Sequence, residues 1–166
     1  MLPAYVPNPV AALFGGGTPV DLGRNYSDGR RVFGDGKTYR GFVAGVVAGI
    51  GVGLFQMWLS GAYNLGYLPE HTLMTVIILP VGALLGDLVK SFFKRRLGKD
   101  QGEKWPVADM YDLVAGSLLL LLSVDPAWTL ANVTLPVLLF ILILTPILHR
   151  SVNIIGFLFR VKEVPW

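Results

Sequence analysis

The stretch GFVAGVVAGIGVGLFQMWLS, residues 41–60, decides the fold class because it contains no ionisable side chain. A helix rises about 1.5 Å per residue, so a run of this length spans the ~30 Å hydrocarbon core of a bilayer. Its glycines, Gly41, Gly45, Gly49 and Gly53, recur every four residues and share one face of the helix. Small residues on one face let a neighbouring backbone approach closely. We therefore predict a transmembrane helix with a packing stripe.

Composition predicts further membrane-spanning segments. Hydrophobic residues make up 53% of the sequence and charged residues 15%, which is outside the usual balance of a soluble domain. Apolar runs predict further helices at about 72–93, 107–124 and 127–148, and a short first helix at 2–14. We expect an all-α integral membrane protein with one polytopic domain, residues 1–166, and about five transmembrane helices.

The distribution of positive charge predicts the orientation. All 14 Lys and Arg residues fall into three segments, with five in 24–40, six in 90–104 and three in 150–162. Cytoplasmic loops carry the excess of Lys and Arg. We therefore expect loops 15–40 and 94–106 and the C-terminus to be cytoplasmic, the N-terminus to be outside, and the tail 150–166 to lie along the membrane interface.

Several chemistries are excluded by composition. The chain has no cysteine, so disulfides, thiolate catalysis and cysteine-ligated metal sites are absent. The net charge of +3 says less than its distribution, and no nucleic-acid partner is expected. The two histidines, His71 and His149, are predicted to lie away from any catalytic centre.

Acidic side chains close to membrane depth are costly, so each needs a reason to be there. Asp87 lies near the end of its predicted helix, and Lys90, Ser91 and Lys94 follow at offsets of three, four and seven residues. At these offsets the four side chains share one helix face. This face combines an acid, a hydroxyl and two bases.

The next helix contributes two more acids. Pro106 suits a first helical turn, and Asp109 and Asp112 lie three residues apart on one side of it. Together with Asp87 they predict a site of hard oxygen ligands, which suits Mg²⁺. The alternative is a set of interfacial salt bridges with the abundant Lys and Arg.

Basic residues surround this predicted metal site. Lys90, Lys94, Arg95 and Lys99 would repel a lone cation but would favour a polyphosphate, whose charge they neutralise. Two segments of the first loop are candidate phosphate cradles, either of which is also compatible with a plain flexible turn. They are Gly15, Gly16, Gly17 and Thr18 in one segment, and Lys37 and Thr38 in the other.

The segment GDLVKSFFKR, residues 86–95, followed by Lys99-Asp100, Pro106 and the pair Asp109 and Asp112, resembles the signature of the phosphatidate cytidylyltransferases. A His-Gly-Gly element that bacterial members carry after the proline is missing here. The small size, the sequence GGGTPVD at 15–21 and the sequence DGRR at 28–31 look closer to the archaeal branch, the CDP-archaeol synthase family. This second resemblance covers nearly the whole chain.

The resemblance implies a reaction and a set of site residues. Members transfer a cytidylyl group from CTP to an isoprenoid glycerol phosphate lipid, unsaturated archaetidic acid, with Mg²⁺ required and pyrophosphate released. The catalytic positions implied are Asp87, Lys94, Arg95 and Asp109, with Asp87, Asp109 and Asp112 at the metal. The nucleotide and phosphate contacts include Lys90, Ser91, Lys99 and Asp100. The lipid bilayer is a further partner, the site would face the cytoplasm, and a homodimer is left open.

Two rival readings predict different features. The CDP-alcohol phosphotransferases carry an Asp-Gly followed by an Ala-Arg pair, whereas Asp28-Gly29 precedes Arg30-Arg31 here. A small transporter or channel component with an Asp cation site would need ionisable residues along a pathway through the membrane. The predicted outer side offers only Glu70 and Asp125.

Overall fold

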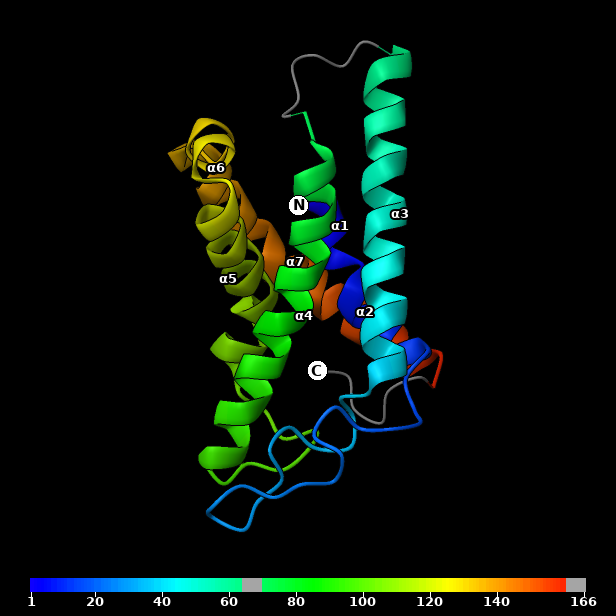
Figure 1. Ribbon diagram of the computed structural model, residues 1–166, viewed down its shortest axis with the longest axis vertical. Coiled ribbons are helices and arrows are strands. Elements are labelled where there is room, and N and C mark those ends of the chain that lie inside the picture. The colour runs from blue at the N-terminus through cyan, green and yellow to red at the C-terminus, as the bar shows by residue number, and fades with distance from the viewer. Residues whose placement is uncertain (64–69, 161–166) are drawn as a thin grey trace.

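The computed structural model of the protein describes residues 1–63 and 70–160, and within them it is helical without strands. Four of its helices are long and apolar enough to cross a membrane, so the chain is a multi-pass membrane protein (Figure 1). The helices are α1 (Leu2–Tyr5), α2 (Pro7–Leu13), α3 (Tyr39–Tyr63), α4 (Leu73–Arg96), α5 (Pro106–Val124), α6 (Pro126–Asn132) and α7 (Leu135–Leu158).

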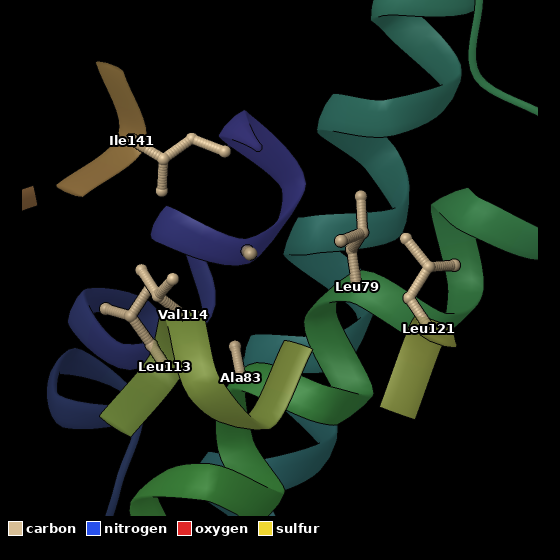
Figure 2. Close-up of a cluster of buried hydrophobic side chains, with 7 residues drawn as sticks. Leu79, Ala83, Leu113, Val114, Leu121 and Ile141 are labelled. Carbon is tan, nitrogen blue, oxygen red and sulfur yellow. The ribbon is translucent and has the colours of Figure 1, made fainter. Parts of the chain in front are cut away.

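The pair α4 and α5 forms the centre of the bundle. Gly86 and Gly116 let the two backbones touch, because a Cβ on Gly86 would overlap the carbonyl oxygen of Asp112 and one on Gly116 would overlap that of Gly82. The Ser117 hydroxyl donates to the Leu79 carbonyl oxygen across the same contact, at 2.9 Å. Figure 2 shows the apolar core around this pair, with Leu79, Ala83, Leu113, Val114, Leu121 and Ile141.

The glycine stripe of α3 packs against the rest of the bundle, as predicted. Gly41, Gly45, Gly49 and Gly53 are the buried residues of this helix. A Cβ at Gly53 would lie 2.7 Å from a methyl group of Val76 on α4, and one at Gly45 would lie 2.7 Å from the carbonyl oxygen of Pro7. The stripe therefore serves helix packing, which needs small side chains at these positions.

The first predicted helix, 2–14, differs from the structure. It is two short helices of four and seven residues, which rise only ~6 and ~10 Å against the ~30 Å of a bilayer core. Both begin with a proline in the first turn, which favours a new helix start. The described residues therefore contain four crossing helices, where the sequence predicted about five.

This N-terminal segment lies along one half of α3. Pro3 packs beside Gly49 and Ala11 packs beside Gly41, so the segment runs antiparallel to the half of α3 nearest the first loop. Ala4 is fully buried in the core. The segment thus contributes to the interior of the bundle, although neither of its helices is long enough to span the membrane.

The predicted helix 127–148 and tail 150–166 also differ from the structure. Asp125 caps the separate helix α6 by accepting from the Trp128 N–H at 3.0 Å, and Val133 is not helical. Helix α7 then starts at Leu135, with Pro136 in its first turn, and continues to Leu158. Residues 150–158 therefore extend the helix, and 161–166 lie outside the described residues.

The two basic loops lie at the same end of the bundle, and α6 lies at the other (Figure 1). The Arg96 guanidinium donates to the carbonyl oxygens of Arg30 and Arg31, at 3.2 and 2.6 Å. It also packs over the ring of Tyr26 at 4.7 Å. The first loop is thereby fixed to the end of α4. Residues 64–69, between α3 and α4, lie outside the described residues.

We expect Gly86→Ala to destabilise the protein, because the added methyl group would force α4 and α5 apart. Overpacking of this kind costs ~1–3 kcal/mol. Gly51→Ala is the matched control, since nothing lies within 4 Å of its Cβ position. Thermal unfolding in detergent should show a lower midpoint for Gly86→Ala and an unchanged or higher one for Gly51→Ala. Equal midpoints would mean that the close contact is not a constraint.

Candidate active site

The Lys90 ammonium lies where three carboxylates meet, at the loop end of α4 and α5. Its distances are 3.0 Å to Asp87 Oδ1, 2.8 Å to Asp112 Oδ2 and 3.4 Å to Asp109 Oδ1. Asp87 and Lys90 are one turn apart on α4, and Asp109 and Asp112 are one turn apart on α5. The contact at Gly86 brings these two turns together.

Two further lysines complete the group. Lys37 lies 2.5 Å from Asp87 Oδ2, and Lys94 lies 3.3 Å from Asp109 Oδ2. Asp87, Asp112 and Lys94 are each 8% exposed, and buried charges persist only when they are paired. We call these six residues the charged cluster: Asp87, Asp109, Asp112, Lys37, Lys90 and Lys94.

The aspartates converge as predicted, but on an ammonium group. Among the described residues, no three His, Cys, Asp or Glu side chains are arranged closely enough to hold a metal ion as they stand. The donors nevertheless fit Mg²⁺, because they are carboxylate oxygens converging on one cation. Asp112 Oδ2 is buried without a hydrogen-bond donor of good geometry, and its close partner is the Lys90 ammonium. The salt-bridge alternative therefore describes the arrangement in this structure.

Two cavities meet at the charged cluster. The apolar cavity, of about 250 Å³, has Asp87, Lys90, Asp109 and Asp112 at its charged part. Its other walls include apolar side chains such as Phe42, Leu84, Leu88, Leu113, Leu148 and Val152. The basic cavity, of about 220 Å³, is lined by Phe33, Gly36, Lys37, Lys90, Ser91, Lys94, Arg95, Gln101 and Gly102. Gly36, Lys37 and Lys90 line both, so the cluster lies between an apolar and a basic compartment.

Most of the predicted site residues are brought together here. Lys37 and Thr38 line the apolar cavity, and Ser91 and Arg95 line the basic one. The Thr38 hydroxyl accepts from the Gly41 N–H at 3.1 Å and so caps the start of α3. The Arg95 guanidinium donates to the Lys99 carbonyl oxygen of its own segment at 2.5 Å and to the Phe33 carbonyl oxygen of the first loop at 3.4 Å, which ties the two basic segments together.

Six predicted residues are not among the described cavity-lining residues. Gly16 and Gly17 are exposed and adopt φ angles of 95° and 77°, which are typical of turns. The Lys99 ammonium lies 2.6 Å from Glu103, and the Asp100 N–H donates to Glu103 at 2.9 Å. The six are Gly15, Gly16, Gly17, Thr18, Lys99 and Asp100.

Polar residues of α1, α2 and α7 were missed by the sequence analysis. His149 and Asn153 line the apolar cavity, with 2.7 Å between His149 Nε2 and Asn153 Nδ2. The prediction that His149 lies away from the site was wrong, because the helix was expected to end at 148. Thr145, which lines the cavity too, pairs with the Tyr5 hydroxyl at 2.7 Å. The four-residue spacing of Thr145, His149 and Asn153 in an apolar run was the available signal.

Asp21 was also missed, and it organises the first loop. Its buried carboxylate accepts from the backbone N–H groups of Gly23, Phe33 and Gly34, at 2.9–3.1 Å, and pairs with Arg31 at 2.5 Å. Burial alone would raise the pKa of this carboxyl, but Arg31 and the N–H groups hold the pKa well below its usual range.

This anchor fixes the position of Lys37. The Val20 N–H, next to Asp21 in sequence, donates to the Lys37 carbonyl oxygen at 2.7 Å. The Lys37 N–H donates to the Gly34 carbonyl oxygen at 3.2 Å, and Gly34 is itself bound to Asp21. A charged carboxylate 16 positions before Lys37 in sequence therefore holds the segment that carries one lysine of the cluster.

Four membrane helices and a buried charged cluster at one end define an integral membrane protein with a polar site between an apolar and a basic compartment. The sequence profile of a CarS-like family, described as CDP-archaeol synthase, matches residues 1–166. The chain therefore belongs to the CDP-archaeol synthase family.

Similar proteins agree with this assignment. CDP-archaeol synthases of Methanoculleus marisnigri and Methanoregula boonei are 63% and 62% identical over 166 residues, covering all of both chains. The corresponding protein of Methanosarcina mazei is 45% identical over 175 aligned positions, again covering both chains fully. A solved structure of an intramembrane enzyme for archaeal membrane lipid biosynthesis superposes with a TM-score of 0.65 at 35% identity. The match covers 87% of this chain and 89% of the other.

We expect Asp21→Asn to loosen the first loop while the helices stay folded. Hydrogen bonds to a charged group contribute ~1.5–3 kcal/mol, so amide exchange in residues 19–38 should become faster by about tenfold or more. Asp35→Asn is the control, because Asp35 also pairs with Arg31 at 2.5 Å but its side chain is 75% exposed. If both variants exchanged at the parent rate, Asp21 would not be the anchor.

Proposed function

We propose that this protein transfers the cytidylyl group of CTP to an isoprenoid glycerol phosphate, producing CDP-archaeol and pyrophosphate in a membrane. The observation that carries the proposal is the position of the charged cluster between two cavities of opposite character. A reaction that joins a lipid phosphate to a nucleotide needs this juxtaposition. Membership of the CDP-archaeol synthase family supports it and disfavours a transporter or channel.

The two substrates are assigned to the two cavities by their chemistry. The triphosphate of CTP fits the basic cavity, where Lys94 and Arg95 supply fixed positive charge. The lipid fits the apolar cavity, with its phosphate toward Lys37 and Lys90 and its hydrocarbon beside side chains such as Leu88. Both phosphates then approach the same pair of lysines from opposite sides.

The reaction places modest demands on the protein. A phosphate monoester has a second pKa near ~6, so the lipid phosphate is largely a dianion at neutral pH and needs no general base. One of its oxygens attacks the α-phosphorus of CTP, a new P–O bond forms, and the bond to the β-phosphate oxygen breaks as pyrophosphate leaves. Lys94 and Arg95 neutralise the negative charge on the leaving group. Lys37 and Lys90 orient the attacking phosphate.

The proposal includes Mg²⁺ held by Asp87, Asp109 and Asp112, whose carboxylate oxygens are ligands of the kind it prefers. When bound, the ion would supply further positive charge to the phosphoryl oxygens. The chain's own contribution is to position these aspartates, which the contact of α4 with α5 at Gly86 achieves.

We place the loop end of the bundle, and with it the site, on the cytoplasmic side. Segments 24–40 and 90–104, which comprise the loops and the adjoining helix ends on that side, contain 11 of the 14 Lys and Arg residues. CTP is present on that side of the membrane. The N-terminal segment and α7 would then approach the site from within the bilayer.

Single cysteines test the orientation cleanly, because the chain has none of its own. Asp35→Cys lies in the exposed first loop, and Glu70→Cys lies at the opposite end, where the Glu70 carbonyl accepts from Trp128 of α6. A membrane-impermeant maleimide should label Glu70→Cys in intact cells and Asp35→Cys only after lysis. Labelling of both from the same side would exclude the proposed topology.

We expect Asp109→Asn to reduce turnover by about a hundredfold or more, the scale of losing one charged group from a phosphoryl-transfer site. The measurement is release of pyrophosphate from CTP by purified protein given the lipid phosphate. Asp125→Asn is the control, since it changes an aspartate at the far end of α5 and asparagine also caps helices. A fully active Asp109→Asn protein, or no pyrophosphate from the parent, would overturn the proposal.

A further inference from the structure

The centre of the charged cluster is occupied by a cation that belongs to the chain. The Lys90 ammonium lies within 3.4 Å of oxygens from all three aspartates, and no other lysine of the cluster does so. Its side chain is 15% exposed, and that of Asp112 is 3% exposed. For these three aspartates to ligate one ion, their carboxylates would have to draw closer around the position that the ammonium now occupies.

The charges of the cluster already cancel. Three carboxylates face three ammonium groups, and every carboxylate has at least one lysine within 3.4 Å. A divalent cation entering the buried cluster by itself would leave excess positive charge where it is poorly solvated, which is unfavourable. Entry becomes favourable only if an ammonium leaves or an anion arrives.

The Lys90 ammonium is placed so that it can move from the carboxylates into the basic cavity. It lines both cavities, and the basic one also contains Lys94 and Arg95. A lysine carries its charge on a flexible four-carbon chain, so rotation about its own bonds can move the ammonium without moving α4. A triphosphate in the basic cavity would provide the oxygens that such an ammonium needs.

We propose that Lys90 is an internal counter-ion that keeps a divalent cation out of the three carboxylates until CTP is bound. CTP would draw the ammonium toward its phosphates and add negative charge, and the cation would then take the vacated position. The inference rests on the proposed function for the identity of the anion. It predicts that metal and nucleotide bind together, and that the metal alone binds poorly.

The test counts bound Mn²⁺ by electron paramagnetic resonance, without lipid phosphate, so that no turnover occurs. Mn²⁺ prefers the same oxygen ligands as Mg²⁺. The parent protein should bind Mn²⁺ weakly without CTP. Lys90→Met should bind it more tightly without CTP, by about tenfold or more, because a positive charge ~3 Å away has been removed.

Two further variants separate this effect from structural damage. Lys90→Arg keeps the positive charge, so it should bind Mn²⁺ as weakly as the parent. Lys104→Met removes an exposed lysine of the second loop that is not among the described lining residues of either cavity, and it should also behave as the parent. Thermal unfolding confirms that each variant is folded.

The outcomes that overturn the inference are specific. Tight Mn²⁺ binding by the parent without CTP would show that Lys90 does not exclude the metal. Unchanged binding in a folded Lys90→Met protein would show the same. Neither result depends on catalysis, so failure of the proposed reaction would appear separately, as absence of pyrophosphate release by the parent.

Discussion

The contact between α4 and α5 at Gly86 and Gly116 is the constraint on which the charged cluster depends. A side chain at either glycine would separate the helices, and Asp112 would then move away from Lys90. The interaction is backbone against backbone, so its geometry does not vary with rotamers. Three acids from two helices can therefore share one ammonium within 3.4 Å at the end of a bundle that is otherwise apolar.

The first loop completes the site by a different means. It has no regular helix between Leu13 and Tyr39, and it is held by one buried carboxylate from within and by the Arg96 guanidinium from α4. Asp21 collects backbone N–H groups and a guanidinium, and the segment it fixes brings Lys37 to Asp87. A rigid helical part thus supplies the acids, and a loop held by hydrogen bonds supplies the third lysine.

The sequence predicted the features that follow from composition and helical spacing. Four of the about five predicted crossing helices, the glycine stripe and the meeting of Asp87 with Asp109 and Asp112 all come from local patterns. The break at Val133 and the continuation of α7 through Arg150 were not predicted, although Pro136 in the first turn of α7 was a local signal for a new helix start. Asp21 was missed because its partners include residues 12 and 13 positions away, a separation that no periodicity reveals. His149 was missed because the predicted helix ended at 148, whereas α7 continues to Leu158.

The apolar cavity is lined by helices from both ends of the chain as well as by those between them. Tyr5 and Asn8 line one side of it and Thr145, His149 and Asn153 another, and the Tyr5 hydroxyl meets Thr145 across 140 positions of sequence. These two walls come from opposite ends of the sequence. The acids and lysines of the charged cluster all precede α7 in the sequence, whereas Thr145, His149 and Asn153 belong to α7 itself. A chain that ended before α7 would therefore keep all six residues of the charged cluster but would lack this wall of the apolar cavity.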